Sequence, residues 1–220
     1  DLHSFPTRRS SDLFVISTVD YLLVNRMLIM DDMGLVVRRC MDKLRFPMFV
    51  KPANLGSSLG ISKVEDRAEL ITALRLASQY DRRILVEQGV NAREVECAII
   101  GNDSPLASGV GEISATHRFY DYEAKYTDGS GTEIRVPADI KKETVEKIRA
   151  YAERAYVALD CAGFARADFL IDRESGELFL SEFNTIPGCT KYSMFPMLWR
   201  ERGIPFKEII ERIEIGRAHV

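Results

Sequence analysis

The chain has 220 residues, of which 46% are hydrophobic and 29% are charged, a composition typical of a globular protein with one or two domains. Lys and Arg number 30 and Asp and Glu 33, and the net charge of -3 argues against a nucleic acid or an anionic membrane as partner. The four cysteines have neither CxxC nor His-paired spacing, and no apolar run reaches the roughly 20 residues that span a bilayer, so we expect a cytoplasmic protein with reduced thiols.

Neither end of the chain fits a periodic pattern. Residues 1–13, DLHSFPTRRSSDL, and residues 214–220, EIGRAHV, resemble translations of sequencing-adapter DNA. We therefore expect both to be cloning or assembly scars and set them apart from the fold, with a natural disordered arm as the alternative. Residues 14–213 would then be a fragment of an open reading frame that is truncated at both ends.

The first part of the chain alternates between helical and strand patterns. Apolar residues at helical spacing between Asp20 and Met33 predict a short core-facing helix that ends at Gly34. Its apolar stripe consists of Leu23, Met27, Met30 and Met33. Asp66 and Glu69 resemble a capping box and predict the start of a second helix. Strands are expected at 46–51, 61–64, 84–88 and 95–100.

Two loops in this order of elements suggest ligand binding. Lys51 precedes the loop ANLGSSLG at 53–60, whose backbone N–H groups and hydroxyls could bind a phosphate. The loop does not match the Walker A pattern. A plain Gly-Ser turn between two strands is the more frequent explanation for such a sequence. Residues 111–132 have no period, and their length and aromatic content favour a functional lid over disorder. The clearest helix follows at 140–159, and two shorter helices are expected at 194–202 and 205–213.

The segment from Phe164 to Gly188 reads as a hairpin with one polar face. If residues 173 and 177 close a three-residue loop with Gly176 in the left-handed region, Asp168 lies opposite Glu182 and Arg166 opposite Asn184. Opposed residues share a face, so all four side chains would point the same way. Leu170 and Leu180 would continue this face, and the other face would hold Phe169, Ile171, Phe179 and Phe183.

The polar face has the composition of a cation site. Two carboxylates and an amide offer the oxygen ligands that Mg2+ prefers, with waters and substrate phosphates as the remaining ligands. The alternative is a solvated sheet face with an incidental ion pair.

Taken together, these motifs resemble the ATP-grasp fold, and specifically the D-alanine-D-alanine ligase family. The resemblance is carried by VKP at 50–52 with GSS at 56–58, YDYEAKY at 120–126, RAD at 166–168 and EFNTIPG at 182–188. It implies an α+β fold in which two subdomains, 14–100 and 101–213 with its lid at 111–132, hold a nucleotide between their sheets.

The resemblance also implies roles for individual residues. The ATP site would consist of Lys51, Ser58, Glu87, Gln88, Val90, Glu94 and Lys125, with the lysines on the phosphates, Glu87 on adenine and Glu94 on ribose. Asp168, Glu182 and Asn184 would hold two Mg2+ ions, or Mn2+. Arg166 and the Gly188 N–H would stabilise an oxyanion, Ser193 and Met194 would bind the second substrate, and Ser57 and Tyr126 would belong to a hydrogen-bonded clasp.

The implied reaction is the ATP-dependent ligation of two D-alanines through an acyl phosphate, for peptidoglycan synthesis. Its partners would be D-alanine and ATP, with no nucleic acid or membrane, and a homodimer is an open alternative to a monomer. A D-lactate or D-serine ligase, another ATP-grasp carboxylate-amine ligase, and a non-catalytic nucleotide-binding regulatory module remain alternatives. Family members that form depsipeptides carry histidine at the position of Tyr126, so the phenol favours D-alanine.

The sequence departs from the family pattern at two positions and does not include one domain of the family. Tyr21 follows Asp20 where a lysine is usual, and Gln88 follows Glu87 where a second lysine is frequent. We also expect the family's N-terminal domain, which would hold the first D-alanine, to lie outside this sequence. We therefore expect the chain alone to bind ATP weakly and not to turn over.

Overall fold

The computed structural model describes residues 16–54, 59–115, 132–190 and 192–217. The chain divides into two compact units, an amino-terminal unit of Val19–Asn91 and a carboxy-terminal unit that contains Ala92–Ser114 and the chain from Glu133 onward. Within the described residues, no helix is long and apolar enough to cross a membrane.

The boundary between the units lies nine residues before the one expected from the sequence. The expected boundary after residue 100 falls inside β5 (Ala92–Gly101), which pairs along its whole length with β8 (Gly163–Asp172). The strand at 95–100 was therefore correctly predicted but assigned to the wrong unit. Its main partner lies far along the chain, and a local pattern does not reveal such a pairing.

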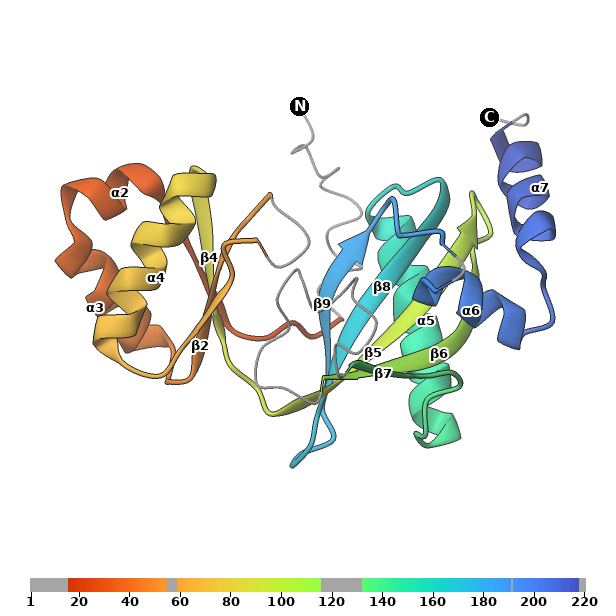
Figure 1. Ribbon diagram of the computed structural model, residues 1–220, viewed down its shortest axis with the longest axis horizontal. Helices are drawn as coiled ribbons and strands as arrows, with labels where there is room; N and C mark the ends of the chain where they lie inside the picture. The colour runs from red at the N-terminus through yellow and green to blue at the C-terminus, as the bar shows by residue number, and fades with distance from the viewer. Residues whose placement is uncertain (1–15, 55–58, 116–131, 191, 218–220) are drawn as a thin grey trace. The chain divides into compact units, whose positions relative to one another are not determined.

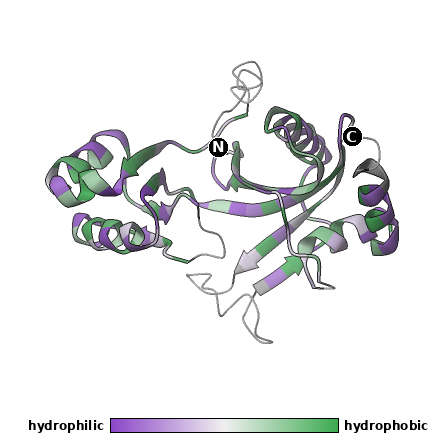
Figure 2. Ribbon diagram, turned by 90° about the horizontal axis from the view of Figure 1, so that it is seen from above, coloured by the Kyte–Doolittle hydropathy of each residue, from purple (hydrophilic) through white to green (hydrophobic). Residues whose placement is uncertain are grey.

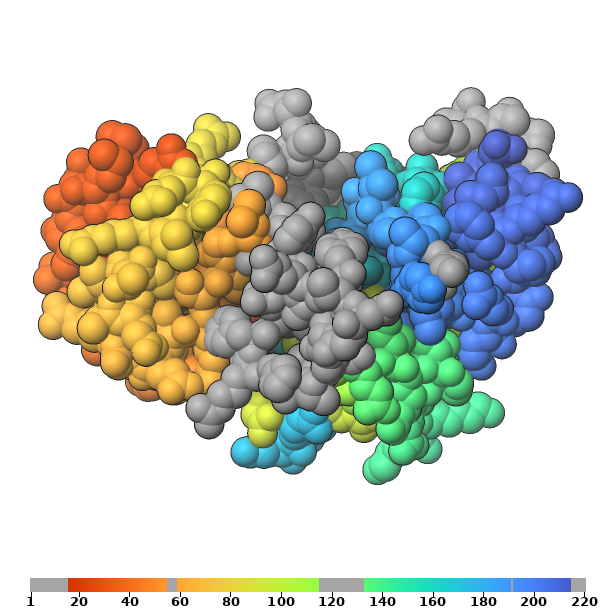
Figure 3. All heavy atoms as spheres, viewed as in Figure 1, coloured from red at the N-terminus to blue at the C-terminus, as the bar shows by residue number. Residues whose placement is uncertain are grey.

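The amino-terminal unit is an antiparallel sheet covered on one face by helices. Its strands are β1 (Tyr21–Asn25), β4 (Arg83–Gln88), β2 (Met48–Pro52) and β3 (Ser62–Val64), in that spatial order. Its helices are α2 (Arg26–Asp31), α3 (Met33–Lys43) and α4 (Arg67–Tyr80). Strand and helix residues share one buried cluster, and hydrophobic and hydrophilic residues alternate around the helices (Figure 2). In the space-filling view, α2 and α4 form part of the surface of this unit (Figure 3).

The helix predicted between Asp20 and Met33 is wrong in its first part. Residues 21–25 form β1, because pairing with β4 overrides the local helical period. The side chains of Asn25 and Asp32 each accept a backbone N–H and begin separate helices, so Gly34 lies inside α3. The stripe expected in the core is largely exposed. Leu23, Met27 and Met30 are 54%, 62% and 72% exposed.

The carboxy-terminal unit is a five-stranded antiparallel sheet with helices on both faces (Figure 1). The spatial order is β7 (Thr132–Arg135), β6 (Leu106–Ala115), β5, β8 and β9 (Leu178–Asn184). The helices are α5 (Lys142–Ala158), α6 (Met194–Glu201) and α7 (Phe206–Arg217). The three predicted helices of this region are thus confirmed, with α7 continuing past residue 213.

Alternate residues of β5 pack on opposite helices. Val95, Cys97 and Ile99 join the cluster formed with α5, whereas Ala98 and Ile100 join the cluster formed with α6 and α7. The expected lid at 111–132 is wrong at its start, since residues 111–115 belong to β6. Its remaining part, except Thr132 in β7, lies outside the described residues.

The hairpin has the predicted polar pairs, but its turn is longer than expected and one strand contains a bulge. The Asp172 N–H donates to the Glu177 carbonyl at 2.9 Å, which closes a four-residue turn in which Gly176 has φ 72°. Ile171 then pairs with Leu178, one residue off the expected register. A bulge at Ser181, between the pairs Phe169–Leu180 and Asp168–Glu182, restores that register.

The bulge also changes which apolar residues reach the core. Leu180 packs against the buried cluster under α5, together with Phe169 and Phe183. Phe179 pairs with Leu170 and is not part of that cluster. The expected positions of Phe179 and Leu180 are therefore exchanged, because the shorter register that runs from the turn to Leu180 reverses the faces of β9.

Candidate functional site

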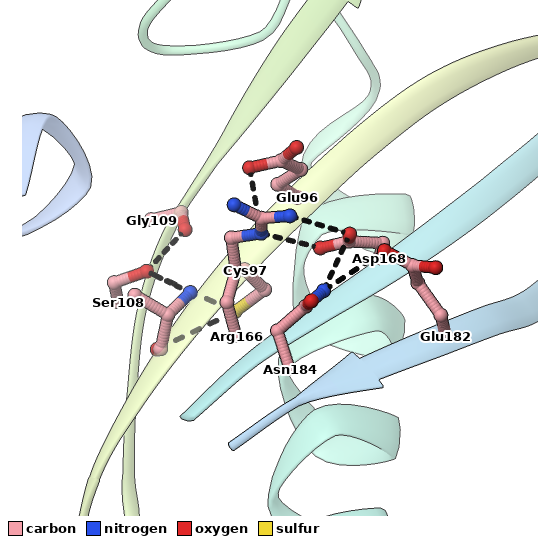
Figure 4. Close-up of polar contacts among 9 residues, drawn as sticks. Glu96, Cys97, Ser108, Gly109, Arg166, Asp168, Glu182 and Asn184 are labelled. Carbon is pink, nitrogen blue, oxygen red and sulfur yellow. Dashed lines mark hydrogen bonds and ion pairs between the residues drawn. The ribbon is translucent and has the colours of Figure 1, made fainter. Parts of the chain in front are cut away.

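The polar face of the hairpin lies on the side of the sheet that α6 and α7 partly cover. Arg166 and Asp168 alternate along β8 with residues packed under α5, and they continue the face that carries Ala98 and Ile100 on β5. Glu182 and Asn184 stand opposite them on β9. The predicted grouping of these four side chains is confirmed (Figure 4).

Arg166 is the centre of the hydrogen-bond network on this face. Its Nε and Nη2 donate to the two carboxylate oxygens of Asp168 at 2.6 and 2.7 Å, a bidentate pair. The side-chain amide of Asn184 donates to Asp168 Oδ2 at 2.9 Å and to Glu182 Oε1 at 3.0 Å. Asp168 therefore uses both of its oxygens within the network.

Negative charge exceeds positive charge at this point. Burial raises the pKa of Asp168 and the nearby carboxylate of Glu182 raises it further, whereas Arg166 lowers it. Burial by itself lowers the pKa of Arg166, but the surrounding carboxylates raise it more, so the guanidinium stays charged. A site with this excess of carboxylates in partly buried surroundings favours a bound cation.

The donor set fits a hard cation once the amide turns. Among the described residues, no three His, Cys, Asp or Glu side chains are arranged as a metal-binding group. Asn184 directs its nitrogen at the carboxylates, and rotation of the amide would direct its oxygen there instead. Two carboxylates and an amide oxygen on one face are ligands of the type that Mg2+ uses. Their role as metal ligands stays a prediction.

Glu96 is a member of this face that the sequence analysis missed. It is the β5 partner of Asp168, only 6% exposed, and its Oε2 lies 2.9 Å from Arg166 Nε. Burial raises the pKa of Glu96, and Asp168 adds to the increase while Arg166 opposes it. A glutamate amid the apolar run VECAII was a signal that could have been followed, since buried charges are rare without a partner.

The amino-terminal unit brings Lys51 and Glu87 together on its helix-free face. Their side chains form an ion pair of 2.7 Å between β2 and β4 and are 19% and 15% exposed. Phe49 and Leu85 flank the pair, because Phe49 is opposite Glu87 and Lys51 is opposite Leu85. The core residues of the same strands point the other way, toward the helices. The face thus presents apolar side chains beside this ion pair.

Gln88 does not point to this face. Its side-chain amide donates to the carbonyls of Arg45, Pro47 and Gly89, and its oxygen accepts the Arg45 N–H at 2.8 Å. Gln88 therefore holds the segment before β2 in place. Val90 is half-buried, and Glu94 lies on β5 in the carboxy-terminal unit, two residues from Glu96.

The predicted substrate residues lie at the start of α6. Ser193 Oγ accepts the Thr190 N–H at 3.1 Å, and a Cβ on Gly188 would lie 3.0 Å from the same oxygen. The Met194 side chain is buried, and its Sδ fills the space where Gly111 lacks a side chain. Met194 can therefore offer a ligand only its backbone. Ser57, Ser58, Lys125 and Tyr126 lie outside the described residues.

The chain resembles known proteins over most of its length. The family model described as D-ala D-ala ligase C-terminus matches residues 12–214. The D-alanine--D-alanine ligase of Acetivibrio thermocellus is 50% identical over 198 residues, which are 90% of this chain and 52% of that protein. That of Ruminiclostridium cellulolyticum is 50% identical over 195 residues, 88% of this chain and 52% of that protein. The chain spans about half the length of these curated relatives.

Solved structures show the same fold. VanG D-Ala:D-Ser ligase from Enterococcus faecalis matches with a TM-score of 0.82 and 32% identity, over 96% of this chain and 61% of that one. The D-alanine-D-alanine ligase from Coxiella burnetii matches with a TM-score of 0.77 and 27% identity, over 95% of this chain and 55% of that one. The α+β, ATP-grasp fold expected from the sequence is confirmed. The chain therefore belongs to the D-alanine-D-alanine ligase family, within the portion that the family model describes as its C-terminus.

Proposed function

We propose that this chain is the ATP- and cation-binding part of an ADP-forming ligase that joins two D-alanines for peptidoglycan synthesis. The observation that carries the proposal is the polar face on which Arg166, Asp168, Glu182 and Asn184 are joined by hydrogen bonds. Membership of the family supports it. Phosphoryl transfer to a carboxylate needs charge neutralisation more than a side-chain nucleophile, and this face supplies charge and ligands without a nucleophile.

Asp168, Glu182 and Asn184 would hold the metal ions, two Mg2+ in the family's pattern, with Mn2+ as a substitute. The metal would neutralise charge on the transferring phosphoryl group and orient it. As a ligand, Asp168 would share its oxygens between the metal and Arg166, and Asn184 would turn its amide oxygen inward, away from the hydrogen bonds that its nitrogen makes now. The guanidinium would then be available to an oxyanion, with the Gly188 N–H as a second donor.

The nucleotide would use the face that carries Lys51 and Glu87. Lys51 would exchange the Glu87 carboxylate for ATP phosphates, and Glu87 would turn to the adenine edge beside Phe49 and Leu85. Backbone groups at Gln88 and Val90 would assist at the base. Further contacts would come from Ser58 and Lys125 on the phosphates and from Glu94 on the ribose.

The second substrate would bind at the start of α6, where Ser193 and the Met194 backbone would hold its carboxylate. The segment with Tyr126 would close over the site, form a clasp with Ser57, and protect the acyl phosphate from water. The net charge of -3 supports small-molecule substrates, ATP and D-alanine, over nucleic acid or a membrane. We further propose a cytoplasmic location, and a homodimer as one candidate assembly.

The test is D-alanine-dependent release of ADP and phosphate by a chimera in which the N-terminal part of the Acetivibrio thermocellus relative precedes this chain. We expect turnover by the chimera, none by the 220-residue chain, and none by the chimera with Glu182→Gln. ATP binding without any D-alanine-dependent turnover would instead favour a regulatory module.

D-serine is the second candidate for the incoming amino acid, because VanG D-Ala:D-Ser ligase is among the matching structures. Tyr126 favours D-alanine over D-lactate, since this phenol is neutral where depsipeptide-forming relatives carry a protonatable imidazole. Product analysis with equal concentrations of D-alanine, D-serine and D-lactate decides among them. We expect D-alanyl-D-alanine as the main product.

A further inference from the structure

Glu96 competes with Asp168 for one N–H group. Arg166 Nε carries a single hydrogen, and it donates to Asp168 Oδ1 at 2.6 Å. Glu96 Oε2 lies 2.9 Å from the same nitrogen, but within the described part of the chain it accepts no hydrogen bond. Figure 4 shows the two carboxylates on either side of the guanidinium. Glu96 Oε2 therefore contacts Arg166 Nε without accepting a hydrogen bond from it.

Such an arrangement needs an explanation. A buried carboxylate oxygen without a donor costs free energy, and buried polar groups are nearly always hydrogen-bonded. Glu96 is 6% exposed and lies in the middle of β5, where neighbouring positions are apolar. Its side chain points to the polar face rather than to either hydrophobic cluster, so its unused oxygen belongs to that face.

Binding of a cation would change the pairing, and this step rests on the proposed function. Both oxygens of Asp168 are occupied, by Arg166 and by the Asn184 amide. A cation on Oδ2, which already accepts two hydrogen bonds, would displace one of these donors, and a cation on either oxygen would compete with the charged guanidinium for the carboxylate. Without another partner, the guanidinium would then lose its orientation in a partly buried site, which is costly for a charged group.

We propose that Glu96 is the positioning residue that takes over the Nε–H of Arg166 when Asp168 turns to a cation. The transfer requires only a small turn of the guanidinium, since both acceptors already contact Nε. It would leave the Nη groups of Arg166 facing the reacting atoms while Glu96 holds the other edge. Glu96 itself touches neither cation nor substrate in this role.

A second arginine pair in the same sheet provides the matched control. Glu112 on β6 is 8% exposed and binds Arg93 Nε and Nη2 at 2.7 Å each, on the opposite face from Glu96. Both of its oxygens are in use, and no predicted cation ligand belongs to the pair. Changes at Glu112 should therefore affect stability without affecting Arg166.

The test follows the exchange of the Arg166 Nε–H with solvent by NMR of the 15N-arginine-labelled chain, with the signal assigned through Arg166→Lys. We compare wild type, Glu96→Gln and Glu96→Leu without Mg2+ and at saturating Mg2+. With Mg2+, we expect exchange about tenfold faster in Glu96→Leu than in wild type, and an intermediate rate in Glu96→Gln, which keeps an uncharged acceptor. Without Mg2+, the three should be alike, because Asp168 holds the N–H.

Equal rates at saturating Mg2+, or the same differences with and without Mg2+, would overturn the role of Glu96. If Glu96→Leu does not fold, the comparison of wild type with Glu96→Gln decides by the same criterion. Glu112→Leu should leave the Arg166 signal unchanged in both conditions.

Cation binding is measured separately, from the loss of the free Mn2+ signal in electron paramagnetic resonance. Cation binding without any dependence on Glu96 would overturn this proposal alone. If wild type with ATP binds no more Mn2+ than the same concentration of ATP alone, the proposed metal site is overturned and this proposal with it.

Discussion

Asp168 and Glu182 are direct partners across β8 and β9, although the pairs nearer the turn are one residue out of that register. Ser181 is the extra residue that accounts for the difference. Deletion of Ser181 should therefore leave Leu180 paired with Phe169 and Glu182 paired with Asp168, in a regular hairpin. Interstrand nuclear Overhauser effects between the backbones of residues 168 and 182 would check this. Their loss would show that the bulge itself is needed for the pairing.

Removal of one carboxylate should weaken cation binding. We expect Asp168→Asn and Glu182→Gln each to lower the affinity for Mn2+ by at least about tenfold, because each removes a charged oxygen ligand from a partly buried site. Titration of the free Mn2+ signal measures the affinity. Glu174→Gln, in the exposed turn of the same hairpin, is the control and should bind as wild type does.

A side chain at Gly111 should destabilise the carboxy-terminal unit. A Cβ there would lie 2.5 Å from Met194 Sδ and 3.1 Å from Leu198 Cδ2, so Gly111→Ala forces the buried Met194 side chain or α6 itself to shift. We expect a loss of about 1–3 kcal/mol in the free energy of unfolding, as for other overpacked cores. Denaturant titration measures it. Gly34→Ala, within α3 and without a contact under 3.3 Å, should be neutral or stabilising.

Glu112 should contribute stability that is lost in acid. The hydrogen bonds from Arg93 lower its pKa below the ordinary value of 4.5, although burial opposes them. A lowered pKa in the folded state means that the contribution is complete above pH 4.5 and disappears as the pH falls through the folded-state pKa. Glu112→Gln should therefore cost about 1–3 kcal/mol at pH 7. The difference from wild type should shrink at acid pH, and a constant difference would contradict the assignment.

The sequence predicted the elements that depend on local signals. The helix at 140–159 and the strands at 46–51 and 84–88 have clear periods, and the structure contains each of them. The hairpin partners were predicted correctly although both the turn length and the strand regularity were not. The longer turn shifts the register by one residue and the bulge at Ser181 shifts it back, so the predicted polar pairs are found. The correct prediction was therefore partly fortuitous.

The features that were missed depend on long-range pairing. Tyr21–Asn25 is a strand because β4, far along the chain, pairs with it. Glu96 belongs to the site because β5 pairs with β8, and nothing near it in sequence reveals that neighbour. The contact between Lys51 and Glu87 has the same origin in the pairing of β2 with β4. Tertiary contacts of this kind override local propensity.

The ion pair of Lys51 with Glu87 would give the proposed nucleotide site a selectivity of its own. Glu87 cannot turn to a base without leaving Lys51 as a half-buried cation that lacks its partner. A nucleoside without phosphates offers no anion to compensate Lys51, whereas a nucleotide brings one. Adenosine would therefore bear the full cost of separating the two charges, and ATP would not. The face would thus distinguish ATP from adenosine by the phosphates, although the two ligands carry the same base.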